Sequence, residues 1–282
     1  MASVIAYDVP LPREAAWPFE GPGARRPATA SEADARALRE ALDRDEVVAW
    51  FQPVHRTSDG ALIGAEAFAR WERPGQTALS HHLLMPIAER AGVSTRITGR
   101  IVAQALAFRR SLAPPAGFSL SVNLSPADLR DPTVVDRLHA VTDGFGGSPC
   151  DLVLEVAEGR LVEAPRGALD RLAALRRRGF GLTVDEFGSG WSSFALLAQV
   201  PFATLKVDAR FMLAAPTDRI AEGIVGACAD LGRRLGLTIA AEGVETDAHR
   251  ALCRRLGIVA AQGTAPGPAL AAADFAARYV AA

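Results

Sequence analysis

Lysine is almost absent from the sequence. All but one of its 31 basic residues are arginine, and Lys206 is the exception. The chain uses arginine elsewhere but has an ammonium inside the apolar run 203–207. This contrast indicates a position that needs a compact, strongly hydrated point charge. The alternative is that the lysine at this position arose by chance and has no functional role.

An excess of one charge and long apolar runs are also lacking. The 31 basic residues are balanced by 32 acidic ones, which gives a net charge of −1. Binding of duplex nucleic acid depends on many uncompensated Lys and Arg side chains, so this class of partner is excluded. Charged residues interrupt every apolar run before it reaches the roughly 18 to 20 residues that span a bilayer. We therefore expect a soluble protein with no membrane span.

Cysteine is scarce. The three cysteines are Cys150, Cys228 and Cys253, and their spacing matches no metal site. An odd, unpatterned set favours reduced thiols that serve as packing residues. Residues 1–16 lack the basic start and apolar centre of a secretory signal. Together these absences predict a cytoplasmic protein.

The first 30 residues differ in composition from the rest. They contain Pro10, Pro12, Pro18, Pro22 and Pro27. This composition breaks helices and predicts a loosely ordered N-terminal tail over residues 1–30. Ser31 can cap a helix whose apolar positions continue to about residue 45. We expect residues 31–282 to form one domain.

After this helix, short apolar runs alternate with longer amphipathic segments. The apolar runs are 47–54, 61–68, 118–124, 152–156, 181–184, 203–207, 237–241 and 258–261. Helical patterns lie at 97–112, 127–141, 168–178, 219–235 and 248–256. Eight strands with interleaved helices predict an α/β fold, a TIM-like (β/α)8 barrel. The tight Ser58-Asp59-Gly60 turn leaves no room for a helix, so the first strand should be antiparallel.

Nearly every predicted strand ends in a polar residue, at the edge where such barrels place their chemistry. These residues are Gln52, Glu66, Asn123, Glu155, Asp185, Glu186, Lys206, Asp208, Glu242 and Gln262. A single acid after a strand usually caps a helix or pairs with arginine, but several that converge repel one another and need cations. Oxygen ligands favour Mg²⁺ or Mn²⁺ over Zn²⁺. The adjacent His81 and His82 cannot both face one site on a helix, so we do not expect them to be ligands.

Several motifs follow one another along the chain. They are Phe51-Gln52-Pro53-Val54, Glu66-Ala67-Phe68-Ala69-Arg70-Trp71, Ser121-Val122-Asn123-Leu124-Ser125, Glu155-Val156-Ala157-Glu158, Asp185-Glu186-Phe187-Gly188-Ser189-Gly190, Leu205-Lys206-Val207-Asp208, Ala241-Glu242-Gly243-Val244-Glu245 and Gln262-Gly263. This set resembles the EAL family of cyclic di-GMP phosphodiesterases over about residues 33–275. The resemblance implies the EAL-type barrel.

The resemblance also implies a centre with two divalent cations, Mg²⁺ or Mn²⁺. One ion would be ligated by Glu66, Asn123, Glu155 and Asp185, and the second by Asp185, Glu186 and Glu242. Lys206 would contact the attacking water, and Asp208 would orient Lys206. Glu242 resembles the residue proposed as general base. The sequence leaves open whether Glu242 accepts the proton or only holds metal.

Three further residues resemble substrate contacts. Arg70 resembles the residue that pairs with a substrate phosphate, a task that suits a guanidinium fork. A surface salt bridge is its alternative role. Gln52 and Gln262 resemble contacts to the edge of the ligand or to metal-bound water. The substrate implied is cyclic di-GMP.

A glycine-rich loop follows the fifth predicted strand. It contains Gly188 and Gly190, and the resemblance implies that it leans on Glu158 and that its neighbouring helix contributes to a homodimer. Glu186 stands where the family usually has aspartate, and the longer side chain moves its carboxylate by about 1.5 Å. Because Mg²⁺ requires near-ideal geometry, the second ion would bind weakly. Ala157 replaces the usual threonine beside this loop.

These features predict a phosphodiesterase that hydrolyses cyclic di-GMP to linear pGpG by a two-metal mechanism. Two other functions stay open. One is a receptor that binds the nucleotide through Arg70 and Gln262 without hydrolysing it. The other is a protein-interaction module that no longer binds nucleotide. The acidic residues argue against the module, because carboxylates that repel one another are costly to retain.

Overall fold

The computed structural model describes residues 31–112, 114, 117–162, 167–188 and 197–280. The predicted tail, residues 1–30, lies outside this part of the chain.

Helix α1 (Glu32–Asp43) begins where the sequence predicts a helix. The Ser31 hydroxyl accepts a hydrogen bond from the Asp34 N–H at 3.1 Å, and the Asp34 carboxylate accepts one from the Ser31 N–H. This capping box satisfies two N–H groups at the start of the helix.

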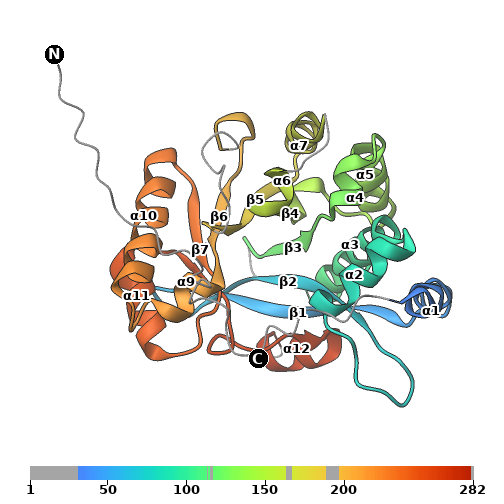
Figure 1. Cartoon of the computed structure of the whole chain (residues 1–282), viewed down its shortest axis with the longest axis horizontal. Helices are drawn as coiled ribbons and strands as arrows, with labels where there is room; N and C mark the ends of the chain where they lie inside the picture. The colour runs from blue at the N-terminus through green and yellow to red at the C-terminus, as the bar shows by residue number, and fades with distance from the viewer. Residues whose placement is uncertain (1–30, 113, 115–116, 163–166, 189–196, 281–282) are drawn as a thin grey trace, which may run out of the picture.

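Eight strands close into a barrel, which confirms the predicted fold class (Figure 1). They are β1 (Val47–Arg56), β2 (Leu62–Trp71), β3 (Ser119–Asn123), β4 (Leu152–Ala157), β5 (Gly181–Phe187), β6 (Thr204–Val207), β7 (Thr238–Ala241) and β8 (Ala260–Ala261). Strands β2 to β8 are parallel neighbours in sequence order, and β1 closes the barrel between β8 and β2. A short strand β9 (Leu270–Ala271) also pairs with β1. The C-terminal ends of β2 to β8 therefore meet at one mouth.

Strand β1 runs against its neighbours, as the short turn predicts. It is antiparallel to β2, β8 and β9. In the turn, the Asp59 carboxylate accepts hydrogen bonds from Arg56 Nη1 at 2.7 Å and from the Ala61 N–H at 3.0 Å. Gly60 has φ of 73°, a conformation that glycine adopts without strain. The resulting register sets Gln52 of β1 opposite Glu66 of β2.

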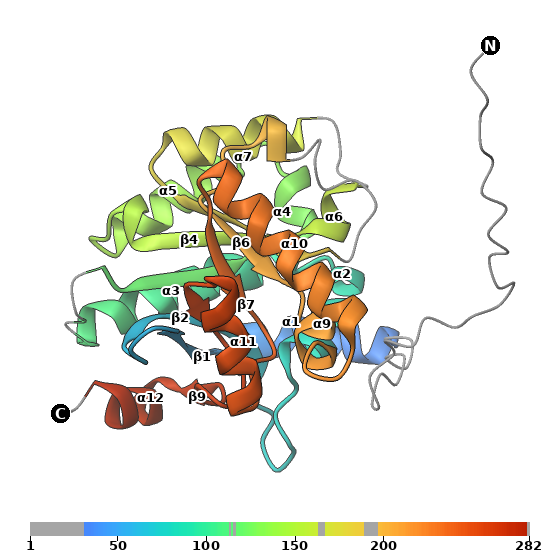
Figure 2. The same ribbon diagram turned by 90° about the vertical axis from the view of Figure 1, so that its left-hand side faces the viewer.

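Helices cover the outside of the barrel (Figures 1 and 2). They are α2 (His81–Ala91), α3 (Ser94–Leu112), α4 (Pro126–Arg130), α5 (Val134–Gly144), α6 (Glu158–Val162), α7 (Ala168–Arg177), α9 (Ala209–Ala214), α10 (Arg219–Leu235), α11 (Asp247–Leu256) and α12 (Ala272–Tyr279), with a 3₁₀ turn at Pro149–Asp151. The predicted single helix over 127–141 is wrong, because the chain is divided into α4 and α5. Asp131 precedes Pro132, and the residue before a proline is driven to extended backbone, here with ψ of 114°.

Aromatic packing fixes the last helix against the barrel. The ring of Phe51 on β1 stacks on Phe108 of α3, with centroids 3.8 Å apart. Phe275 of α12 meets both rings edge-on, at 6.3 Å from Phe51 and 5.5 Å from Phe108. Figure 2 shows α12 lying below β1 and beside β9. This cluster therefore covers the outer face of β1 with apolar surface.

The cysteine prediction is confirmed for two residues and wrong for the third. Cys228 and Cys253 are buried, and burial raises the pKa of Cys228 to about 11 and that of Cys253 to about 12. Cys150 is exposed in the turn before β4, so it is not a packing residue. In the described part of the chain, no helix is long and apolar enough to cross a membrane.

Candidate active site

The polar side chains at the strand ends meet inside the mouth of the barrel. Side chains alternate along a strand, so Glu155 of β4 points inward while its neighbours Leu154 and Val156 pack toward the helices. The register sets Asn123 of β3 beside Glu155. Glu66, Glu155 and Lys206 are 1%, 3% and 4% exposed. The barrel thus buries two acids and the one lysine together.

The Lys206 ammonium lies among four carboxylates. Its Nζ is 2.7 Å from Glu66 Oε2 and 2.7 Å from Glu155 Oε2. It is 2.8 Å from Glu242 Oε1 and 3.5 Å from Asp185 Oδ1. One ammonium carries one positive charge and three N–H donors, so it cannot neutralise four ionised carboxylates. Negative charge remains in excess at this point.

Burial and repulsion shift the protonation of the cluster. Burial, followed by repulsion from Glu66, raises the pKa of Glu155 well above its ordinary value. Burial also raises the pKa of Asp185, and it raises the pKa of Glu242 to about 8. Burial acts on Glu66 in the same direction, but the Lys206 ammonium and hydrogen bonds outweigh it and lower the pKa of Glu66. Three of the four carboxyl groups therefore favour either a proton or an additional cation.

Lys206 itself stays charged. Burial opposes the ammonium charge, but the surrounding carboxylates outweigh this effect and raise the pKa of Lys206 well above its ordinary value. The unusual lysine of the sequence therefore stands at the electrostatic centre of the mouth. An arginine fork would bring a larger, planar group to this space.

Three amide side chains surround Glu66. Asn123 Nδ2 donates to Glu66 Oε1 at 2.6 Å, and Gln262 Nε2 donates to Glu66 Oε2 at 2.9 Å. Gln262 also donates to Gln52 Oε1 at 3.0 Å. Gln52 Nε2 in turn donates to the Gly267 carbonyl at 3.2 Å. These bonds fix the Glu66 carboxylate and bring Gln52 and Gln262 to the rim of the cluster.

The donor set fits a hard cation. One oxygen each from Glu66, Glu155 and Asp185 lie within 4.8 Å of one another. Carboxylate oxygens with a neighbouring carboxamide suit divalent ions that prefer oxygen. A bound cation would also offset the excess negative charge that raises the pKa values of Glu155 and Asp185. The buried triad can therefore hold a metal ion.

Glu186 lies at the rim, beyond the triad. The residue is exposed, and its φ of 53° is in the left-handed region that residues other than glycine seldom adopt. Its N–H donates to Asp185 Oδ1 at 2.9 Å. Partial desolvation, followed by repulsion from Asp185 and Asp208, raises the pKa of Glu186. The carboxylate thus faces the same excess of negative charge as the triad.

Glu158 contacts the loop that the sequence assigns to it. The residue is buried, and its Oε2 accepts a hydrogen bond from the Gly188 N–H at 2.9 Å. Gly188 has φ of 98°, which only glycine adopts readily. Gly190 lies outside the described residues. The contact is the one that a supporting role of Glu158 requires.

Two residues predicted for the site lie away from the central cluster. Asp208 caps α9, and its carboxylate accepts from the Arg210 N–H at 2.7 Å and pairs with the Arg210 guanidinium at 2.8 Å. Among the described residues, no bond joins Asp208 to Lys206. The Arg70 guanidinium carbon lies 5.3 Å from the centroid of the Trp50 ring. The roles of Asp208 and Arg70 stay predictions.

A cavity of about 380 Å³ opens over the cluster and has lining residues that the sequence analysis did not assign. They include His81 and His82, the first two residues of α2, and Arg160 of α6. Both histidines border the cavity, because the start of α2 lies over the mouth, and the expectation that they are not metal ligands stays a prediction. Burial lowers the pKa of His81 to about 4, so its imidazole is neutral.

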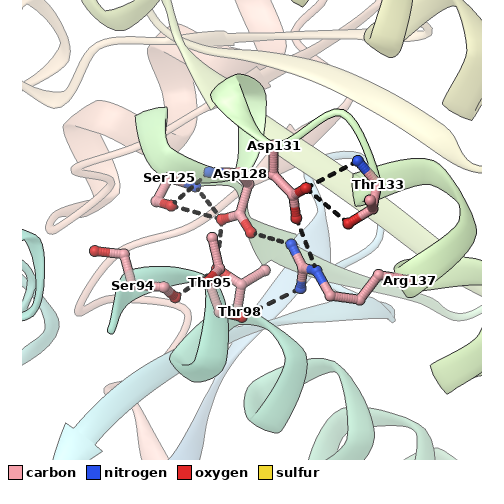
Figure 3. Close-up of polar contacts among 8 residues, drawn as sticks. All are labelled: Ser94, Thr95, Thr98, Ser125, Asp128, Asp131, Thr133 and Arg137. Atoms are coloured by element: carbon pink, nitrogen blue, oxygen red, sulfur yellow. Dashed lines mark hydrogen bonds and ion pairs between the residues drawn. The ribbon is translucent and has the colours of Figure 1, made fainter. Parts of the chain in front are cut away.

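A buried network anchors the segment after Asn123 (Figure 3). The Asp128 carboxylate accepts hydrogen bonds from the Ser125 N–H at 2.9 Å, the Ser125 hydroxyl at 2.6 Å and the Thr98 hydroxyl at 2.7 Å. It also pairs with Arg137 at 2.6 Å. These bonds tie α3, α4 and α5 together. The network therefore holds the end of β3, from which Asn123 reaches Glu66.

The family match extends over the barrel. The EAL domain family matches residues 35–269. The chain belongs to this family. This EAL domain is 32% identical over 223 residues to the cyclic di-GMP phosphodiesterase RocR of Pseudomonas aeruginosa, covering 79% of this chain and 57% of RocR. It is 32% identical over 211 residues to the probable cyclic di-GMP phosphodiesterase PdeG of Escherichia coli, covering 74% of this chain and 42% of PdeG. The EAL domain thus spans about half the length of these curated relatives.

Solved structures share the fold. The solved structure named PaMucR phosphodiesterase, c-di-GMP complex, is 32% identical, with a TM-score of 0.82 over 86% of this chain and 99% of the chain in that structure. An EAL domain protein of Listeria monocytogenes is 24% identical, with a TM-score of 0.76 over 89% of this chain and 99% of that protein. In the present EAL domain, Phe68 of the Glu66-Ala67-Phe68 motif lines the cavity, with its ring 5.8 Å from that of His81.

Proposed function

We propose that this EAL domain is a phosphodiesterase that hydrolyses one phosphodiester bond of cyclic di-GMP to give linear pGpG. The observation that carries the proposal is the group of four carboxylates around Lys206 at the floor of the cavity. Relatives of similar sequence are named cyclic di-GMP phosphodiesterases, and PaMucR is in complex with c-di-GMP. Both facts support this choice of substrate.

Two divalent cations, Mg²⁺ or Mn²⁺, would complete the centre. One would be held by Glu66, Asn123, Glu155 and Asp185, and the other by Asp185, Glu186 and Glu242. Bound ions of this kind lower the pKa of a water molecule and offset the charge that develops on phosphate. The raised pKa values of Asp185, Glu186 and Glu242 support this assignment, because each carboxylate is short of positive charge.

Lys206 and Glu242 would act on the attacking water. A water beside the Lys206 ammonium would also lie near Glu242, whose Oε1 is 2.8 Å from Nζ. Burial raises the pKa of Glu242 to about 8, so it would accept a proton from this water only with bound cations that keep its carboxylate ionised. Lys206 would donate a hydrogen bond to the water or to the negative charge on the phosphate. Asp208 would hold the end of β6, and so orient Lys206, by capping α9.

The rim of the cavity would bind the nucleotide. Gln52 and Gln262 present amide groups beside Glu66 and would contact the ligand edge or water. Arg70 would pair with one phosphate, and Arg160, which lines the cavity, offers a second guanidinium for the other phosphate. Glu158 would keep the Gly188 loop in place beside the second ion.

A second candidate function is a cyclic di-GMP receptor with little turnover. The observation that favours it is Glu186, which has one more methylene than aspartate and a left-handed backbone. A displaced carboxylate weakens a Mg²⁺ site, because this ion requires near-ideal geometry. The cavity and its amide and guanidinium groups would still bind the ligand.

We further propose that the domain forms a homodimer in the bacterial cytoplasm. The resemblance of the sequence motif at 185–190 to the family supports the dimer, and the unpaired cysteines support a reducing compartment. Light scattering coupled to gel filtration would test the assembly. A mass near that of one chain at about 10 μM would contradict the dimer.

A turnover assay tests the proposed activity. Purified protein is incubated with cyclic di-GMP and Mn²⁺, and pGpG is measured by chromatography, with Glu66→Ala as the inactive control. The proposal predicts pGpG from the wild type only. Absence of pGpG above the control would contradict it, and calorimetric binding without turnover would then support the receptor. Absence of both binding and turnover would support the protein-interaction module.

A further inference from the structure

A second cavity lies on the side of the loop after β8 that is turned away from the acidic cluster. Its volume is about 450 Å³. None of its lining residues borders the cavity over the Lys206 cluster, which we call the acidic cavity. The end of β1 contributes His55 and Arg56, and α11 contributes Arg250 and Arg254. The loop after β8 separates the two cavities, because Gln262 borders the acidic one while residues 265 and 266 border the other. We call this second space the basic pocket.

Positive charge predominates in the basic pocket. Three guanidinium groups line it, from Arg56, Arg250 and Arg254, against one carboxylate, Asp59. Asp59 pairs with Arg56 at 2.7 Å, so it neutralises only one of the three. The chain as a whole carries a net charge of −1, so this concentration of cations is local.

Two of these cations are available to a ligand. The Arg250 Nη2 donates to the Ala265 carbonyl at 2.6 Å, which holds its guanidinium against the wall, and its Nη1 meets the highly exposed Asp247 at 3.2 Å. The Arg254 guanidinium forms no hydrogen bond or ion pair with any described residue, although the Arg254 carbonyl accepts from the Gly257 N–H. A guanidinium carries five N–H donors, so both side chains have donors left.

His55 adds a polar group to the inner wall. Its Nδ1 is buried and has no hydrogen-bond partner among the described residues. A buried polar atom without a partner is uncommon, because its desolvation is then uncompensated. The groups that face His55 are Arg250, which acts on it electrostatically, and the ring of Tyr279 at 5.8 Å. A ligand oxygen in the pocket would satisfy Nδ1 when this nitrogen carries the proton.

We propose that the basic pocket binds a small molecule that carries a phosphate group. Guanidinium forks match phosphate oxygens in two-pronged hydrogen bonds. The volume exceeds that of one phosphate, so the pocket also admits an organic part. Apart from Gly60, Ala261, Ala265 and Pro266, the lining side chains are polar or charged, which suits a polar ligand over an apolar one. The site is separate from the acidic cluster and does not depend on its function.

Calorimetry with inorganic pyrophosphate tests the pocket. The full chain is used without divalent ions, because the acidic cluster then repels anions. We expect saturable binding that Arg254→Gln weakens by about ten-fold, the effect of losing one charge-assisted bond. Arg255→Gln, on the same helix but outside the pocket, should leave the affinity unchanged. Citrate serves as a carboxylate probe and should bind more weakly than pyrophosphate.

Proton NMR of the histidine rings locates the bound anion without a variant. The His55 signals should shift during the pyrophosphate titration, whereas those of His139, on α5, should not. The proposal is overturned if pyrophosphate does not saturate, if citrate binds as tightly, or if Arg255→Gln weakens binding as much as Arg254→Gln. It is also overturned if the His55 signals stay fixed while heat of binding is observed.

Discussion

Lys206 Nζ and Glu155 Oε2 lie 2.7 Å apart, and both side chains are almost fully buried. This pair joins β4 and β6 across the mouth of the barrel. Breaking a buried ion pair by removing one partner leaves the other charge uncompensated. The same ammonium that supports the fold in this way is proposed to contact the attacking water. Lys206 is therefore expected to contribute both to the stability of the fold and to the proposed catalysis.

Lys206→Met should impair both properties. Without the ammonium, four carboxylates share a buried space, so the free energy of unfolding of the metal-free protein should fall by about 3 to 5 kcal/mol. Hydrolysis of cyclic di-GMP should fall at least about 100-fold, because a preorganised cation is lost. Urea unfolding and the pGpG assay measure the two effects. Arg36→Met, an exposed change on α1, is the control and should alter neither; activity equal to wild type in Lys206→Met would refute the assignment.

Glu186→Asp should raise activity. The shorter side chain restores the length usual in the family, and aspartate tolerates the left-handed backbone at this position better than most residues. We expect kcat to rise by about three- to ten-fold at limiting Mg²⁺, where the weaker ion controls the rate. Glu245→Asp makes the same chemical change at another residue that lines the cavity and should have little effect. A decrease with Glu186→Asp would show that the longer carboxylate is needed.

Glu158→Ala should loosen the loop that carries Gly188. The variant removes the acceptor of the 2.9 Å bond to the Gly188 N–H. We expect activity to fall by about ten-fold or more, because misplaced ligands cost rate even when the chemistry is intact. Glu158→Gln keeps an acceptor oxygen and should retain more activity than the alanine variant. Equal losses in the two variants would argue against this hydrogen bond as the cause.

The metal-free protein should lose stability as the pH rises. The pKa of Glu242 is about 8 in the folded protein and 4.5 in its ordinary state, so the folded state binds more protons between these values. The free energy of unfolding then falls as pH increases through this window. Glu155 and Asp185, whose pKa values are also raised, act in the same direction.

Melting temperatures in EDTA and in Mg²⁺ measure this effect. We expect Tm in EDTA to be lower at about pH 8.5 than at about pH 6, and Mg²⁺ to restore more stability at the higher pH because its ligands must be deprotonated. Glu242→Gln should flatten the profile in EDTA. A Tm in EDTA that rises over this range would contradict the pKa assignments.

Asp128→Ala should destabilise the fold near β3. The carboxylate is fully buried, accepts three hydrogen bonds and pairs with Arg137 (Figure 3). Its removal leaves the buried donors of Ser125 and Thr98 without this acceptor and leaves Arg137 with only Asp131 as an ion-pair partner, so we expect a loss of about 3 kcal/mol in the free energy of unfolding. Asp136→Ala removes an exposed pair with Arg178 and should cost less than about 1 kcal/mol. Similar losses in both variants would mean that the network contributes no special stability.

The barrel and the centre of the site could be predicted from the sequence because both follow from periodicity. Alternation along each strand sets which side chain points inward, and parallel strands bring their ends together. A short apolar run contains or adjoins each of Glu66, Glu155 and Lys206. The sequence therefore predicts that these side chains come together at the mouth of the barrel. The antiparallel β1 followed from a turn too short for a helix.

The rest of the site depends on helices whose position no spacing specified. His81, His82 and Arg160 line the cavity because α2 and α6 start above the mouth, and their sequences contain no signal for that location. The division between α4 and α5 had a local cause, Pro132, that the apolar periodicity masked. Arg70 and Asp208 contact Trp50 and Arg210, contacts that depend on side-chain directions the motifs do not encode.

Anomalous diffraction from crystals grown with Mn²⁺ tests the central claim most directly, because it locates the ions themselves. The account predicts two peaks about 3.5 to 4 Å apart, one among Glu66, Asn123, Glu155 and Asp185 and the other beside Glu186 and Glu242. A single peak at the first position would limit the account to one ion and support the receptor. Absence of any peak near Lys206, with Mn²⁺ bound elsewhere or not at all, would contradict it.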